Sequence, residues 1–232
     1  MSTPPDLLTS LRDALSSDRI DAYRVTPSDT DLDLLERYFW NMALSEALYP
    51  SLHALEVALR NNIHDGATQL YGTLDWLTLQ PPILVVSEQD KVTAVLGKLG
   101  GSPGTPITAG KIVAELTFGF WTSLHDKRYQ HRLWPLLLRD VFPNMPRRLR
   151  TRHTASVRMS EIRRLRNRVF HHEPIWHWQN LRKQHEDLVE AIGWLDRAMI
   201  DTITLFDRFP AVYGQGSSLY RGQIEQLDQN WP

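Results

Sequence analysis

The chain has no cysteine and no long apolar run. With no cysteine among its 232 residues, disulfides and cysteine-ligated zinc are excluded. No stretch approaches the roughly 18 consecutive apolar residues that a membrane-spanning helix needs. The N-terminal residues Met1–Asp6 show neither the basic nor the apolar segment of a secretory signal peptide. We therefore expect a soluble, cytoplasmic protein that has no membrane association.

Strand-like alternation of apolar and polar residues is also scarce, and Ile83–Val86 is the one run that resembles a strand. Apolar residues instead recur at intervals of three and four along most of the chain, which is the spacing of amphipathic helices. A hydrophobic content of 42% is enough for a sizeable core. The sequence therefore predicts an all-α protein, a bundle of about seven or eight helices.

Turn-forming residues suggest how these helices are organised. We expect an N-terminal helix and linker over residues 1–26, a main helical domain over 27–210 and a C-terminal tail of uncertain order over 211–232. Within the main domain, Pro50 should separate two long helices, because proline disrupts helix interiors. The glycine-rich segment 97–110 should form a loop, and a last long helix should run from about Leu181 to Phe209.

Positive charge is concentrated in one segment, although the whole chain has a net charge of −1. Between positions 147 and 168 there is one acid, Glu161, and the net charge of this segment is +8. Its nine arginines are Arg147, Arg148, Arg150, Arg152, Arg158, Arg163, Arg164, Arg166 and Arg168. Such a segment indicates either a local anion-binding site or a solvated basic helix face.

The most informative residues follow at the end of this segment. Arg166 and Asn167 precede the paired histidines His171 and His172. Pro174 disfavours helical geometry at the residue before it, so the arginine-rich helix should end near the histidines. Helical residues advance by about 100°, which places Asn167 and His171 on one face and requires Arg166 to reach around with its long side chain.

These residue types suit the cleavage of a phosphodiester. His171 can take a proton from a ribose 2′-hydroxyl or give one to a leaving oxygen. Arg166 can bind and stabilise the phosphate, and Asn167 can position it. His172 should anchor the helix end or donate a supporting hydrogen bond. Since one histidine supplies only an acid or a base, this mechanism predicts a homodimer. The alternative is that these side chains simply satisfy the carbonyls at the helix end.

The segment 164–175 resembles the C-terminal motif of the Abi-like (abortive infection) proteins. Segments 115–121 and 55–61 resemble the middle and N-terminal motifs of the same family, and Arg166 with His171 matches the arginine–histidine signature of the HEPN superfamily. This resemblance implies an all-α fold, RNA as substrate, a dimeric cleft and a role in prokaryotic defence or as a toxin. It also implies that Arg166, Asn167 and His171 are catalytic.

Further residues are candidates for supporting roles. Glu56 and Arg60 are four residues apart, and they form either a helix-stabilising ion pair or a supporting group in which Glu56 orients Arg166 or His171. We expect the RNA backbone to be bound by Arg158, Arg163, Arg164 and Arg168. The histidines and acids lack the spacing of a zinc site, so we expect no metal and no cofactor.

The sequence therefore predicts a metal-independent endoribonuclease that acts as a homodimer on RNA. An antitoxin or another defence-system protein is a further possible partner. A non-catalytic RNA-binding or protein-interaction module on the same helical scaffold is the competing hypothesis. A third is that the chain is the inert member of a toxin–antitoxin pair.

Overall fold

The computed structural model describes residues 6–100 and 106–231, and the regular secondary structure in these ranges is entirely helical. The all-α prediction is therefore confirmed for the described residues. They contain twelve α-helices and two short 3-10 helices, so the predicted count of seven or eight was too low. Ile83–Val86 is not a strand, because the chain bends there and the next helix begins at Val86.

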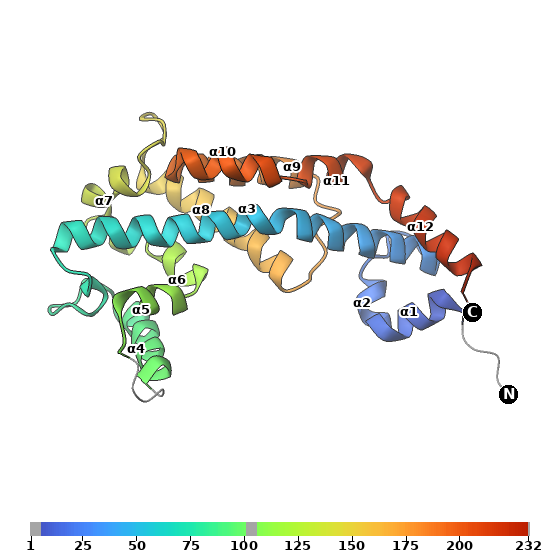
Figure 1. Cartoon of the computed structure of the whole chain (residues 1–232), viewed down its shortest axis with the longest axis horizontal. Helices are drawn as coiled ribbons and strands as arrows, with labels where there is room; N and C mark the ends of the chain where they lie inside the picture. Colours follow the sequence, from blue (N-terminus) through green and yellow to red (C-terminus); the bar gives the residue numbers. More distant parts are fainter. Residues whose placement is uncertain (1–5, 101–105, 232) are drawn as a thin grey trace. The chain divides into compact units, whose positions relative to one another are not determined.

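The elements follow one another along the chain as Figure 1 labels them. They are α1 (Leu7–Leu15), α2 (Ser17–Asp21), α3 (Asp31–Tyr71), η1 (Trp76–Thr78), α4 (Val86–Gly100), α5 (Ala109–Glu115), α6 (Phe118–Ser123), η2 (Lys127–Tyr129), α7 (Trp134–Val141), α8 (Arg152–Phe170), α9 (Leu181–Leu195), α10 (Arg197–Phe206), α11 (Phe209–Gln215) and α12 (Ser218–Gln229). We find none among them with the length and hydropathy of a membrane span.

Helix α3 continues through Pro50, and Figure 1 shows this helix as one unbroken ribbon. The predicted interruption at Pro50 was therefore wrong. A proline inside a helix removes one backbone hydrogen bond and costs about 3 kcal/mol or more. Ala47, Leu48 and Leu52 are buried on either side of it, and their burial offsets that cost.

The predicted last long helix is divided into α9 and α10, because an acidic side chain starts a new helix inside it. The Asp196 carboxylate accepts a hydrogen bond from the Met199 amide at 2.6 Å. Such a side-chain cap favours a helix start at that point over continued helix. Helix α11 begins at Phe209, the last residue of the predicted helix, whose amide donates to the Asp207 carboxylate at 3.1 Å.

Two other segments differ from the sequence interpretation. Helix α4 extends to Gly100, so the first residues of the predicted glycine-rich loop are helical. Residues 101–105 lie outside the described ranges. The segment that we expected to be a tail forms α12, and Arg221 of this helix donates to the Glu36 carboxylate at 2.6 Å.

The chain divides into two compact units, one formed by residues 1–50, 165–185 and 206–232, the other by 51–164 and 186–205. The predicted boundaries at residues 26 and 210 stay predictions. In the first unit, Ile20, Tyr23, Leu34, Leu35 and Ile224 form a buried cluster. Helix α1 contacts α2 and α12 there.

In the second unit, α4 contacts α5 and η1. Asn62 ties two chain segments of this unit together, because its side-chain nitrogen donates to the carbonyl oxygens of Val141 at 2.9 Å and Leu195 at 3.2 Å. Burying an amide requires such partners. The aromatic residues of the middle motif, Phe118, Phe120 and Trp121, are buried and therefore belong to the core.

Candidate functional site

The arginine-rich helix ends where the sequence predicted, in a hydrogen-bonded cap. The last helical residue of α8 is Phe170, and His172 has a left-handed backbone with φ of 56°. The His172 amide donates to the Val169 carbonyl at 3.2 Å, and the Glu173 amide donates to the Arg168 carbonyl at 2.9 Å. This pair of bonds is a Schellman motif, which satisfies carbonyls at a helix end. The backbone of His172 therefore anchors the helix end.

Side chains on both sides of the cap hold it in place. Arg168 forms an ion pair with Glu173 at 2.5 Å, and these are the residues joined by the outer backbone bond. The chain beyond the cap is fixed by Asn41, whose buried side-chain oxygen accepts from the amides of Ile175 at 2.7 Å and Trp176 at 3.1 Å. The sequence analysis missed Asn41, although an amide among the apolar residues of one helix face was a usable signal.

A groove of about 530 Å³ lies beside this helix end, entirely within the first unit. Its lining residues are Met42, Ser45, Glu46, Tyr49, Pro50, Val169, Phe170, His172 and Arg208. Arg208 and Glu46 form an exposed ion pair across 2.5 Å. The groove therefore combines an apolar and aromatic surface with charged residues at its border.

The ring of Phe170 connects the groove to the predicted catalytic arginine. The guanidinium carbon of Arg166 lies 4.2 Å from the centroid of the Phe170 ring, in a cation–π contact. The Tyr49 ring also contacts Phe170, with 5.7 Å between the two ring centroids. Tyr49 is 50% exposed and Phe170 is 37% exposed. The arrangement presents a guanidinium and two aromatic rings at the edge of the groove.

The three predicted catalytic residues occupy the last turns of α8 and its cap. Arg166 and Asn167 are half-buried, and His171 is exposed. The His171 amide donates to the Asn167 carbonyl at 2.9 Å, so the two residues keep the helical spacing that the sequence predicted. His171 stands in the chain between two residues that line the groove, Phe170 and His172. The His171 side chain is therefore open to solvent, although it does not itself line the groove.

The supporting residues Glu56 and Arg60 belong to the second unit, and Arg166 belongs to the first. The orientation of Arg166 or His171 by Glu56 therefore stays a prediction. The alternative, a helix-stabilising ion pair between Glu56 and Arg60, also stays a prediction. Among the described residues, the buried Nε of Arg60 donates to no acceptor.

The four predicted RNA-binding arginines differ in how much of their charge is compensated. Arg158 pairs with Asp187 at 2.9 Å and Glu190 at 2.8 Å, and its guanidinium lies 4.7 Å from the centre of the Trp194 ring. These contacts indicate that Arg158 mainly stabilises the fold. Arg168 is paired with Glu173, as described above. Arg163 and Arg164 are exposed.

Arg163 also connects two of the sequence motifs. A side chain on Gly119 would approach its guanidinium to 3.3 Å, so the absence of a Cβ there leaves room for the arginine. Gly119 belongs to the middle motif, and Arg163 precedes the C-terminal motif. A Cβ at position 119 would therefore require the Arg163 guanidinium to shift by a few tenths of an ångström.

The second unit contains a buried carboxylate that the sequence analysis missed. The Glu88 side chain accepts hydrogen bonds from five donors between 2.8 and 3.2 Å away, namely Ser87, Lys91, Ser123, Arg128 and Tyr129. Burial raises the pKa of Glu88, but these donors outweigh burial and lower it overall. Burial also raises the pKa of the Tyr129 hydroxyl to about 12. Since every oxygen of Glu88 is occupied, this cluster is structural.

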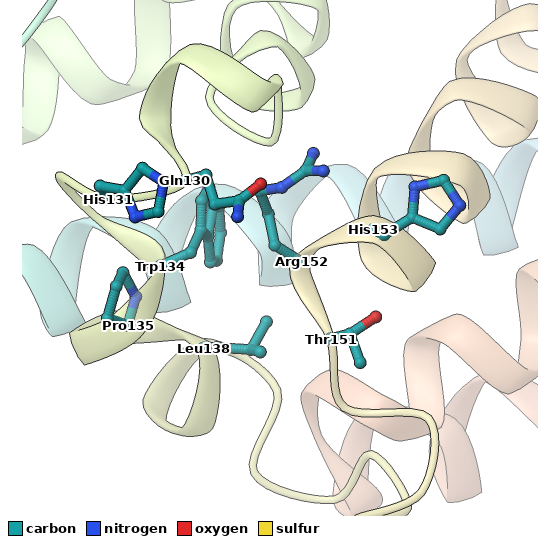
Figure 2. Close-up of a pocket in the computed structure, with 8 residues that line it drawn as sticks. All are labelled: Gln130, His131, Trp134, Pro135, Leu138, Thr151, Arg152 and His153. Carbon is teal, nitrogen blue, oxygen red and sulfur yellow. The ribbon is translucent and has the colours of Figure 1, made fainter.

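The second unit contains a hollow of about 360 Å³. Figure 2 shows the residues that line it. In this view Gln130, Trp134 and Arg152 lie between the exposed side chains of His131 and His153. Arg152 donates to the His125 carbonyl at 2.7 Å, while its buried Nε donates to no acceptor among the described residues. The hollow is therefore lined by the apolar side chains of Trp134, Pro135 and Leu138 together with polar side chains such as Gln130 and Thr151.

The histidine behind this hollow is buried. His125 stacks on the Trp134 ring with 4.3 Å between ring centroids. Burial lowers the pKa of His125 to about 4, so the imidazole is neutral at physiological pH. Within the described ranges, no three histidine, aspartate or glutamate side chains lie close enough together to hold a metal ion.

Comparison of the chain with protein-family models, with curated proteins and with solved structures finds no match.

Proposed function

We propose that the protein is a metal-independent endoribonuclease of a phage-defence or toxin–antitoxin type system. The proposal rests on the Abi-like motifs of the sequence and on one structural observation. Exposed His171 lies in the chain between two residues that line the groove, and the Arg166 guanidinium lies 4.2 Å from the ring centroid of one of them, Phe170. RNA supplies both groups that such a surface binds, an anionic backbone and flat bases.

In the proposed reaction, His171 removes the proton from a ribose 2′-hydroxyl. The 2′-oxygen then attacks the adjacent phosphorus, and the bond from phosphorus to the 5′-oxygen breaks. Arg166 stabilises the negative charge that builds up on the phosphoryl oxygens, and Asn167 positions the phosphate. The products carry a 2′,3′-cyclic phosphate and a 5′-hydroxyl.

The leaving 5′-oxygen needs a proton, and a second histidine supplies it most directly. We propose that a second copy of the chain brings its own Arg166 and His171 to the same phosphate. The active form is then a homodimer. Sedimentation of the wild-type protein with and without RNA tests this, and a strictly monomeric but active protein would contradict the two-copy mechanism.

The decisive experiment measures cleavage of single-stranded RNA in the presence of EDTA. Wild-type protein should cleave, and His171→Ala should reduce the rate by about 10²- to 10⁴-fold, the usual contribution of a general acid or base. His177→Ala is the matched control, because it removes an exposed histidine of the same unit that does not line the groove. If Arg166→Ala and His171→Ala both cleave like wild type, the assignment is wrong.

A non-catalytic RNA-binding module is the second candidate. It is favoured by the fact that His172 is used as a helix cap and that the Arg166–Phe170 stack can hold a base without any chemistry. In that case RNA binding should weaken steeply with salt. Intact RNA should be recovered at every pH between 5 and 9, which the endonuclease proposal does not allow.

A further inference from the structure

The turn between α7 and α8 contains a second concentration of positive charge, in the second unit. Arg139, Pro143, Arg147 and Arg150 line a hollow of about 490 Å³ there. Three of these four residues are arginines, and none is acidic. The sequence analysis placed Arg147 and Arg150 in the basic segment but did not connect them to Arg139, which lies on α7.

The backbone around this hollow is fixed by the core. Phe142 and Met145 are fully buried on either side of Pro143. The Asn144 amide between them donates to the Trp194 carbonyl at 3.1 Å. Because the turn is fixed at Phe142, Asn144 and Met145, it keeps its shape without a ligand. The hollow is therefore present before anything binds.

Arg150 is held in one orientation by the same turn. Its Nε and Nη2 donate to the Met145 carbonyl at 3.0 and 2.6 Å, and Nη2 also donates to the Pro143 carbonyl at 3.0 Å. These bonds use one edge of the guanidinium and leave Nη1 for another acceptor. Since the guanidinium is already ordered, a ligand that binds it loses less conformational entropy.

The other two arginines are exposed and have uncompensated charge. Among the described residues, no carboxylate lies within 4.0 Å of the Arg139 or Arg147 guanidinium. The nearest acid in the sequence, Asp140, lies beside Gly66 of α3. Three guanidinium groups therefore surround one hollow and repel each other until an anion binds among them.

We propose that this hollow binds phosphate groups, and that its ligand is a nucleotide or an RNA segment. Guanidinium groups fork onto phosphate oxygens, and three of them match a ligand with several negative charges better than a single carboxylate. The hollow of Figure 2 is lined by residues that are next in sequence to two of these arginines. Leu138 precedes Arg139, and Thr151 follows Arg150. The ribose and base can extend toward it. This site does not depend on the proposed cleavage.

Calorimetric titration with inorganic pyrophosphate, at constant ionic strength, tests the site. Arg139→Ala and Arg147→Ala should each weaken binding about tenfold or more, which is the effect of removing one charge-assisted hydrogen bond. Arg148→Ala is the matched control, because Arg148 is an exposed arginine of the same turn that does not line the hollow. It should bind nearly as wild type does. Both Arg139 and Arg147 are exposed, so their variants should fold, and circular dichroism checks this.

The two sources of phosphate are separated by competition. A nucleoside triphosphate that displaces pyrophosphate more strongly than a short RNA identifies a nucleotide site, and the reverse order identifies an RNA-backbone site. His171→Ala should bind pyrophosphate like wild type, so failure of the cleavage proposal leaves this result intact. The inference is overturned if wild type shows no saturable binding, or if Arg148→Ala weakens binding as much as Arg147→Ala does.

Discussion

Glu88 in the second unit and the Arg166–His172 helix end in the first unit are both rich in charged groups, but their environments are opposite. The Glu88 carboxylate is fully buried, and five donors occupy its oxygens. At the helix end, Phe170, His171 and His172 are exposed beside a groove. A buried group with all its hydrogen bonds made stabilises the fold, whereas an exposed group beside a cavity is available to a ligand.

The largest loss of stability is expected when the buried Glu88 carboxylate is removed. Glu88→Ala removes a buried carboxylate, leaves a cavity and takes an acceptor from the buried Tyr129 hydroxyl. The free energy of unfolding should fall by about 3–5 kcal/mol, because the cavity and the lost hydrogen bonds both cost stability. Denaturation with urea measures it.

Glu115→Ala is the control for that measurement. Glu115 pairs with Lys98 at 2.5 Å, but the side chains are 35% and 69% exposed. Such surface pairs contribute about 0–1 kcal/mol. An equal loss of stability in the two variants would mean that burial does not distinguish these carboxylates.

The second expected effect is a loss of stability at low pH that is caused by buried His125. Its pKa is lowered to about 4 by burial, from 6.5 in an exposed histidine. As pH falls from 6.5 toward 4, the unfolded state takes up a proton that the folded state does not, so the protein loses stability. The loss attributable to His125 is at most about 3 kcal/mol, and it is absent above pH 6.5.

Thermal unfolding between pH 7.5 and 4.5 measures this loss. Burial lowers the pKa of His64 as well, so the wild-type slope contains contributions from both histidines. His125→Phe keeps a ring against Trp134 but cannot be protonated, and its slope should therefore be shallower than that of wild type. An identical slope in the two proteins would show that His125 does not contribute.

The third effect is at the aromatic surface of the groove. Phe170→Ala removes the ring between Tyr49 and Arg166, and RNA binding should weaken by about 1–3 kcal/mol, the contribution of one base–aromatic stack. Fluorescence anisotropy with a labelled single-stranded RNA measures this change. Phe206→Ala is the control, since Phe206 is a 60% exposed phenylalanine of the same unit that does not line the groove. Equal weakening in both variants would remove the groove from the RNA-binding surface.

The same contrast explains which features could be predicted from the sequence. The all-α class followed from the spacing of apolar residues, and the end of α8 followed from Pro174, because both are local patterns. Helix α3 is not interrupted at Pro50, because the burial of apolar residues on both sides of the proline offsets the loss of one backbone hydrogen bond. The break between α9 and α10 came from Asp196, whose capping role is ambiguous within a charged sequence.

Long-range partners were beyond local patterns. Glu88 has the sequence signature of an acid in the first turn of a helix, yet Ser123, Arg128 and Tyr129, about forty residues later, make it a buried acceptor. Arg158 has the signature of a basic helix face, but Asp187 and Glu190 neutralise it. Arg139 and Arg147, in contrast, have no carboxylate partner among the described residues. Nothing in the spacing of Arg139 indicated that it would lie beside the basic turn.

The smallest expected effect separates the structural and chemical roles of the paired histidines. His172 has a φ of 56°, which glycine adopts without the steric cost that a Cβ brings. His172→Gly should therefore raise the free energy of unfolding by about 0.5–1 kcal/mol. His171 has no such backbone, so His171→Gly should lower it by about 1 kcal/mol, because glycine is unfavourable at the end of a helix with negative φ.

Urea denaturation and RNA cleavage measured on the same two variants complete the test. If His172 acts only through its backbone, His172→Gly is more stable and cleaves RNA at the wild-type rate, while His171→Gly is inactive. A His172→Gly protein that is stabilised but inactive would show that the imidazole in the groove takes part in the chemistry. The catalytic role would then pass from the exposed histidine to the one that lines the groove.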